Sequence, residues 1–268
     1  MLPLHRKQFP SSKEELAQAL NEALRRLAPR SNPLCDVRSR VFLYLDEIAI
    51  NLDREQFDSL PPAASTVVGE TKPAFEAAVV TLSARNISVH GVPIDLRMEA
   101  YDVVFHKGED ANGDAVLVVQ KARDGHIVIS AAQLALEEAM TQIGGREARR
   151  HGIAIEQVRL AMRARGRRSL CADIRVQARK LLFRTSIEIY GQLDIDDEFV
   201  AKISQLKCKG DGAIGSMACN VLEPFIRRLE GKDFPLKSPP LGEIQLRDIH
   251  IAVADTIALT IDFGTATE

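Results

Sequence analysis

An internal repeat constrains the fold of this chain more than any other feature of its sequence. Residues 95–105 (DLRMEAYDVVF) align with residues 173–183 (DIRVQARKLLF), and Asp, Arg, Ala and Phe are identical at matched places. Upstream at the same offset, Val80 and Leu82 match Val158 and Leu160. Apolar and polar residues alternate in both copies, which is typical of an antiparallel hairpin with one apolar and one polar face.

The repeat continues beyond the hairpin. Residues 125–132 (GHIVISAA) align with residues 191–198 (GQLDIDDE), and both segments have the pattern of a strand followed by a helix N-cap. In the first copy we expect Ser130 to cap a helix that ends at Gly144 and Gly145.

In the second copy we expect Asp196 or Asp197 to cap a helix that runs to about Leu206. A weaker third copy of the hairpin lies at residues 248–251, which resemble residues 86–89.

A repeated unit of this kind cannot bury its apolar face alone, so the units have to stack. We therefore predict an α+β fold, with a long, highly curved antiparallel sheet wrapped around amphipathic helices. The strand twist curls such a sheet and encloses an elongated apolar slot. The slot is either a packed core or a ligand groove, and the sequence leaves both open.

The first 70 residues have a different pattern and form a separate predicted region, followed by the main domain at 71–268. Ser12 and Glu15 have the spacing of a capping box, and leucines and alanines then recur on one face of a helix over 12–27. That helix could be a packed lid, a partner helix or a membrane-surface helix. Residues 41–52 are a strand candidate, and residues 57–73 are expected to be a linker.

The composition gives little evidence for a particular partner or compartment. The formal net charge is −2, and residues 1–10 lack the apolar run of a secretory signal. The four cysteines, Cys35, Cys171, Cys208 and Cys219, have no CxxC spacing, so we expect free thiols and no zinc site. These features predict a cytoplasmic protein, which could also bind peripherally to a membrane.

A search for catalytic motifs indicates a protein that is not an enzyme. The six histidines form no i,i+4 pair, and GxSxG does not occur. Gly210–Gly215 matches GxGxxG in form, but it follows an expected helix end, so we interpret it as a flexible connection. No cofactor is expected, although scattered residues can converge in space.

Basic residues are concentrated between Arg146 and Arg184. This segment holds twelve arginines and lysines against three acidic residues, an excess of nine positive charges. The excess is compatible with a solvated sheet face, with a dock for anionic lipid headgroups, or with nucleic-acid binding. We rank nucleic acid last, because interleaved aromatic residues and a known module are missing.

Three phrases in the second part of the chain carry a family resemblance. They are residues 82–91 (LSARNISVHG), 125–134 (GHIVISAAQL) and 234–249 (FPLKSPPLGEIQLRDI). With the order of elements between residues 77 and 263, they make the chain resemble the LmeA-like phospholipid-binding family of bacteria, within the tubular lipid-binding (TULIP) superfamily. The resemblance implies a highly curved sheet on a long helix, with an apolar groove for acyl chains, and it supplies no catalytic residue.

The preferred hypothesis is binding or transfer of a lipid or other hydrophobic ligand. An anionic membrane surface is one place where this binding or transfer could occur. The alternative is a non-enzymatic scaffold that captures a protein through the 12–27 helix. The expected groove residues are Leu136, Met140, Val158, Leu160, Met162, Ile174, Val176 and Phe225. The expected headgroup contacts are Arg163, Arg165, Arg167 and Arg168.

Overall fold

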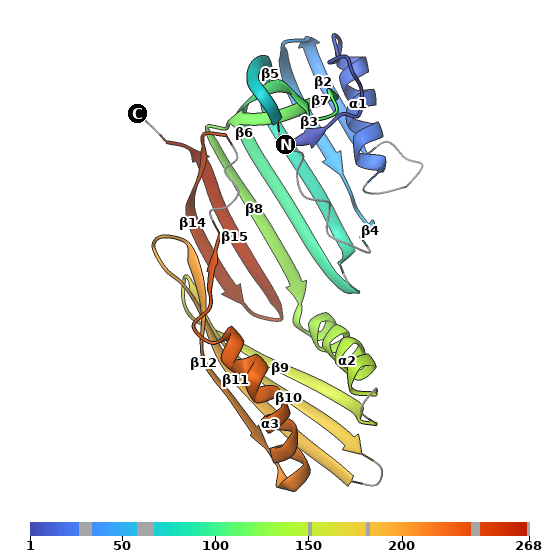
Figure 1. Cartoon of the computed structure of the whole chain (residues 1–268). Coiled ribbons are helices and arrows are strands. Elements are labelled where there is room, and N and C mark those ends of the chain that lie inside the picture. Colours follow the sequence, from blue (N-terminus) through green and yellow to red (C-terminus); the bar gives the residue numbers. More distant parts are fainter. Residues whose placement is uncertain are drawn as a thin grey trace. The chain divides into compact units, whose positions relative to one another are not determined.

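The structure, a computed structural model, describes residues 1–26, 34–57, 67–89, 91–149, 152–180, 183–236 and 242–266. Within them the protein is α+β, with many strands and few helices (Figure 1). The chain divides into two compact units. The first unit comprises Met1–Ile129, Pro239–Asp248 and Thr260–Glu268, and the second comprises Ser130–Ser238 and Ile249–Leu259. The expected division at residue 70 stays a prediction.

The first unit is built on an open, mixed sheet of ten strands. Its order is β14-β15-β8-β6-β5-β3-β2, with β1 on β7, β4 on β5 and β7 on β6. The strands β8, β14 and β15 continue along the chain into the second unit. The bounds are β1 (Leu2–Pro3), β2 (Cys35–Val41), β3 (Tyr44–Asn51), β4 (Gln56–Phe57), β5 (Val67–Val89), β6 (Val92–Asp110), β7 (Ala115–Lys121), β8 (Asp124–Ala132), β14 (Ile244–Val253) and β15 (Thr256–Thr265).

The expected N-terminal helix is confirmed as α1 (Lys13–Arg25). The Ser12 hydroxyl accepts a hydrogen bond from the backbone N–H of Glu15 at 3.2 Å, as an N-cap should. The return half of the capping box is displaced by one residue, because the Glu15 carboxylate accepts from the backbone N–H of Ser11 at 2.8 Å. The apolar stripe of α1 is buried in the first unit, so a partner that used this helix would have to contact its polar face.

One expectation for the N-terminal region is confirmed and one needs correction. The strand expected at 41–52 is β3, which runs from Tyr44 to Asn51 and forms a hairpin with β2 before it. Part of the expected linker, from Val67 to Pro73, lies in β5, where Pro73 pairs with His106 of β6. Residues 58–66 of that linker lie outside the described residues.

The hydrophobic core cluster of the described residues lies in the first unit. The α1 side chains Leu16 and Leu20 join Leu45, Phe75 and Phe105 from the sheet. The rings of Phe75 and Phe105 have centroids 4.8 Å apart, a favourable spacing for an aromatic pair. Packing of this kind accounts for the stability of the first unit without a ligand.

The second unit is a five-stranded antiparallel sheet with two helices. The strand order is β13-β12-β11-β10-β9. The bounds are α2 (Gln133–Arg149), β9 (Ala154–Gly166), β10 (Ser169–Lys180), β11 (Phe183–Ile195), β12 (Val200–Gly210), α3 (Gly212–Leu229) and β13 (Asp233–Pro235). Pro235, Pro239 and Pro240 predict a second linker, which starts inside β13, and its residues 237–240 lie outside the described residues.

The expected start and end of α2 are wrong. Ser130 lies in β8, which runs to Ala132, and the helix begins at Gln133. Gly144 and Gly145 do not end the helix, which continues to Arg149. A Cβ on Gly144 would lie 3.1 Å from Cδ1 of Ile155, so this glycine permits close packing of the helix on β9.

The helix expected at 196–206 is a strand, β12. The Asp196 carboxylate accepts from the backbone N–H groups of Glu198 and Val200 at 3.0 and 2.9 Å, and Phe199 has a positive φ of 59°. These contacts make a tight Asx turn between β11 and β12. An Asx turn uses the same side-chain oxygen as a helix N-cap, which explains why the sequence pattern predicted a helix here. The aligned segments 95–105 and 173–180 each lie in the second strand of a hairpin, β6 and β10, whereas the elements that follow 125–132 and 191–198 differ. The repeat itself stays a prediction.

Candidate ligand-binding face

The register of the second unit places its apolar residues on a single face of the sheet. Leu160 of β9 is paired with Ile174 of β10, which is paired with Ile189 of β11. Cross-strand partners share a face, and neighbours along a strand alternate between faces. The apolar face consists of Val158, Leu160, Met162, Leu170, Ala172, Ile174, Val176, Ile187, Ile189, Gly191, Leu193, Ile203 and Leu206.

The apolar face is only partly covered by the protein itself. Val158, Leu160 and Ile187 are buried, whereas Met162, Ile174, Val176, Ile189 and Leu193 are half-buried. Two α2 residues of the expected groove, Leu136 and Met140, are also half-buried. The expected groove residue Phe225 lies in α3, and its side chain is outside the described ones. Of the eight expected residues, five therefore combine apolar character with remaining accessible surface.

The opposite face of the same sheet is charged. Arg175 donates to Glu188 at 2.6 Å, and Arg163 lies 3.5 Å from Asp173. These pairs join neighbouring strands, so most of the alternating arginines have carboxylate or amide partners across the sheet. The basic excess of the sequence is thus largely a solvated sheet face.

The four expected headgroup arginines lie in two different places. Arg163 and Arg165 project from the charged face, away from the expected groove. Arg167 and Arg168 lie in the turn between β9 and β10, where Arg168 forms an ion pair with Asp197 at 3.0 Å. Arg168 also lies 5.0 Å from the ring centroid of Phe199, so it holds the β11–β12 turn. Their role as headgroup contacts stays a prediction.

Helix α2 is attached to the edge strand β9 by polar side chains that the sequence reading missed. The Glu137 carboxylate accepts from the backbone N–H of Leu160 at 2.9 Å, and the Gln133 side chain donates to the Leu160 carbonyl. The Thr141 hydroxyl accepts from the backbone N–H of Val158 at 3.1 Å. These residues recur every four positions, so they form a polar stripe on one face of the helix. That stripe was the sequence signal for the contact with β9.

Glu137 is the most buried carboxylate of this unit, with its side chain 8% exposed. Burial raises its pKa, but the N–H of Leu160, the Gln133 amide and the Arg159 guanidinium together outweigh burial and hold the pKa below its ordinary value. Glu137 is therefore ionised at neutral pH and acts as an acceptor for the β9 backbone.

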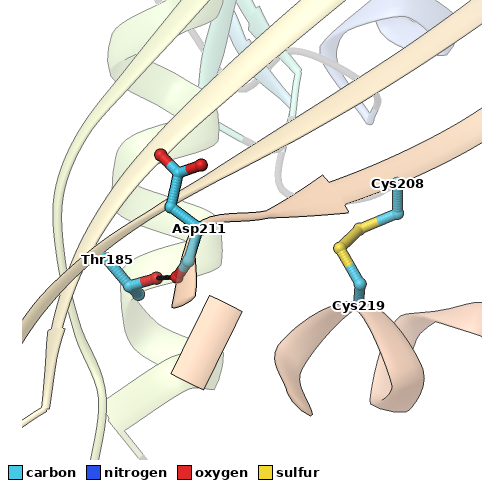
Figure 2. Close-up of a disulfide and its surroundings, with 4 residues drawn as sticks. All are labelled: Thr185, Cys208, Asp211 and Cys219. Atoms are coloured by element: carbon cyan, nitrogen blue, oxygen red, sulfur yellow. Dashed lines mark hydrogen bonds between the residues drawn. A yellow bond between two sulfur atoms is a disulfide. The ribbon is translucent and has the colours of Figure 1, made fainter. Parts of the chain in front are cut away.

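A disulfide links α3 to the sheet, which corrects the expectation that Cys208 and Cys219 are free thiols. Cys208 of β12 is bonded to Cys219 of α3, as Figure 2 shows. Cys208 is paired with Ile189, so the bond leaves the sheet on its apolar face. Cys35 and Cys171 are free and buried, and burial followed by the nearby Asp36 charge raises the pKa of Cys35 to about 12.

Gly210 and Gly215 have a packing role, which corrects the interpretation of this segment as a flexible connection. Asp211 is the N-cap of α3, and its carbonyl accepts from the Thr185 hydroxyl at 3.0 Å (Figure 2). A Cβ on Gly210 would overlap the backbone of Gly215, so both glycines allow β12 and α3 to approach closely.

Comparisons of this chain with protein-family models, with curated proteins and with solved structures each gave no match. Among the described helices, none is long and apolar enough to cross a membrane. Across the same described residues, no group of three or more His, Cys, Asp or Glu side chains is placed to hold a metal ion.

Proposed function

We propose that this protein binds a lipid or another ligand with an alkyl chain on the apolar face of its second unit, without catalysing a reaction. The observation that carries the proposal is the partial exposure of neighbouring side chains on that face. Met162, Ile174 and Val176 keep accessible surface, although Val158 and Leu160 beside them are buried. Partly exposed, contiguous apolar surface of this kind is typical of binding sites.

The sequence resemblance to LmeA-like proteins supports the same proposal, since that family binds phospholipids. The finer features of the family, a sheet curled around its helices and an acyl-chain groove, belong to this proposal. Burial of an alkyl chain contributes about 0.8 kcal/mol per methylene to the free energy of binding. Contact of several methylenes with the half-buried side chains therefore makes binding favourable.

A pair of matched substitutions tests the proposal. Ala172 is a small residue on the apolar face, paired with Met162 and Gly191, and Ala161 lies on the charged face opposite Asp173. We expect Ala172→Phe to displace three or four methylenes of the ligand, which corresponds to about 2–3 kcal/mol and a loss of affinity of at least tenfold. Ala161→Phe makes the same chemical change in solvent and should leave affinity unchanged.

The measurement is uptake of a fluorescent fatty acid by delipidated protein, with native mass spectrometry of the freshly purified protein beside it. Saturable uptake that is lost in Ala172→Phe and kept in Ala161→Phe would support the proposal. No uptake by the unsubstituted protein, or equal losses in both variants, would refute it.

A further inference from the structure

One end of the second unit combines exposed apolar and basic side chains; we call it the hairpin end. The first residue of β9, Ala154, is paired with Arg179 of β10, and Arg179 is paired with Arg184 of β11. One residue further along β11, Thr185 donates to the Asp211 carbonyl at the start of α3. The C-terminus of α2 lies here too, because Gly152, just before β9, donates its N–H to the Arg149 carbonyl.

Two large apolar side chains are exposed at the hairpin end. Phe183 is 64% exposed, and Met217, in the second turn of α3, is 66% exposed. Phe183 alternates with Arg184 and is in phase with Ile187 and Ile189, so it extends the apolar face to the end of the sheet. An exposed aromatic residue that continues an apolar face is well placed to enter the boundary between lipid headgroups and acyl chains.

Basic side chains lie at the same end of the unit. Arg146 and Arg149 at the end of α2, together with Arg179 and Arg184, are exposed. Glu156 lies 3.4 Å from both Arg179 and Arg184, and the exposure of both arginines makes these pairs weak. The described charged side chains of this end are the four arginines and two acidic residues, Glu156 and Asp211. The surplus is positive and complements anionic phosphates.

The opposite end of the sheet, at the β9–β10 turn, differs in degree: Leu236, which donates its N–H to the Phe199 carbonyl there, is 39% exposed, against 64% for Phe183. In the turn at 166–169, the Arg167 carbonyl accepts from the N–H of Ile251 and the Arg168 carbonyl accepts from the N–H of Ile195. Arg168 is engaged with Asp197 and Phe199. This turn is occupied by contacts within its own unit.

We propose that the hairpin end docks on the surface of an anionic phospholipid bilayer, with Phe183 and Met217 at the acyl boundary and the four arginines on the phosphates. This inference rests on the proposed function, because docking at this end brings the apolar face to the source of its ligand. Two exposed apolar residues with four arginines at the same end are too small a surface for a stable protein interface, whereas they suit shallow insertion into a bilayer.

The absence of tryptophan from the chain allows a direct test. Phe183→Trp introduces a single indole at the hairpin end, and Leu134→Trp introduces one at an exposed apolar position (59% exposed) at the start of α2. Leu43→Trp reports the exposed turn between β2 and β3 of the first unit. Each variant is mixed with vesicles of equal parts phosphatidylglycerol and phosphatidylcholine that contain a brominated acyl chain.

We expect a blue shift and quenching for Phe183→Trp, and neither effect for Leu134→Trp or Leu43→Trp. Vesicles of phosphatidylcholine alone should give weak quenching, and added salt should reduce it on the anionic vesicles. Absence of quenching at position 183, or equal quenching at all three positions, would overturn the proposal.

Charge variants test the arginines separately. Each basic side chain near an anionic surface raises the partition coefficient onto vesicles about fivefold. The double substitution Arg179→Gln with Arg184→Gln should therefore lower vesicle binding about 25-fold. Arg163→Gln with Arg165→Gln removes the same charge from the body of the charged face and should change binding less than the hairpin-end pair. Equal losses for the two double variants would contradict a localised dock.

Uptake of a monomeric fluorescent fatty acid separates this inference from the proposed function. The hairpin-end variants should keep uptake in solution while they lose vesicle binding. If uptake fails in the unsubstituted protein, the proposed function is wrong, whereas absent vesicle binding with intact uptake refutes the docking site alone.

Discussion

Replacement of Glu137 by alanine should detach the edge strand β9 from α2. The carboxylate accepts the N–H of Leu160 at 2.9 Å, and Leu160 is buried, so the substitution leaves a buried donor without an acceptor. Such a loss costs about 1–3 kcal/mol. The ion pair with Arg159, which is 60% exposed on the arginine side, adds less than about 1 kcal/mol. The expected total is about 2–3 kcal/mol.

Amide hydrogen exchange is the appropriate assay, because a chain of two compact units need not unfold in one step. We expect the Leu160 amide to exchange about 30- to 150-fold faster in Glu137→Ala. Glu137→Gln keeps an oxygen acceptor and should lose about 1 kcal/mol. Glu138→Ala, at the exposed neighbouring position, is the control. Equal exchange at Leu160 in Glu137→Ala and Glu138→Ala would refute the assignment of Glu137 as the acceptor that holds β9.

The same contact has a pH dependence with a defined sign. The folded-state pKa of Glu137 lies below its ordinary value of 4.5, so its contribution is fully present above that value. Protonation removes the contribution as the pH falls through the folded-state pKa. The unsubstituted protein should therefore lose protection of Leu160 in acid, whereas Glu137→Gln should not show this loss.

Three further substitutions test the packing of β12 and α3. Cys208→Ser with Cys219→Ser removes the disulfide between residues 11 apart. The loss should lower the free energy of unfolding by about 3 kcal/mol and speed amide exchange in α3. Unchanged exchange would contradict a structural role for the bond. Gly210→Ala places a methyl group against the Gly215 backbone and should lower the thermal midpoint of the second unit, with a cost of about 1–3 kcal/mol; a variant as stable as the parent would show that the glycine is dispensable. Asp196→Ala removes the acceptor of two backbone N–H groups and should raise exchange at Val200 by about tenfold, whereas Asp197→Ala should not.

The sequence was sufficient to predict the hairpins and the apolar and charged faces. Alternation with a period of two is a property of the strand itself, so Val158, Leu160 and Met162 were correctly assigned to one face before the register was known. The N-cap of α1 was also correct, because Ser12 precedes a stripe with helical spacing. These features depend on near neighbours in the chain.

The wrong predictions concern features that depend on distant contacts. An aspartate that accepts two N–H groups is compatible with a helix N-cap and with an Asx turn, and the pairing of β12 with β11 decides between them at Asp196. Gly144 and Gly145 remain helical, with Ile155 of β9 packed against Gly144, although glycine pairs commonly end helices. The partner of Cys208 is likewise set by the position of α3, which the spacing of the cysteines does not reveal.

The disulfide also changes the argument about location. Free thiols were part of the support for a cytoplasmic protein, and disulfides persist mainly in oxidising compartments. Cytoplasmic location therefore stays a prediction that the Cys208–Cys219 bond argues against. Alkylation of the protein before and after reduction, as isolated from its native source, tests this point: two additional labelled cysteines after reduction indicate that the bond forms in the cell.

An accessible apolar face creates a risk of association, and the second unit limits that risk at both edges of its sheet. At the β9 edge, Gln133, Glu137 and Thr141 occupy backbone groups that would otherwise be free to pair with another strand. At the opposite edge, β13 pairs only with residues 200–202 of β12, and Lys207 and Lys209 in the rest of β12 are exposed and charged. Since the edges are protected while Met162, Ile174 and Val176 keep accessible surface, growth of the sheet is disfavoured and the apolar face is left accessible to the proposed ligand. Glu137→Ala should therefore increase self-association through β9, and light scattering that matches Glu138→Ala would count against this explanation.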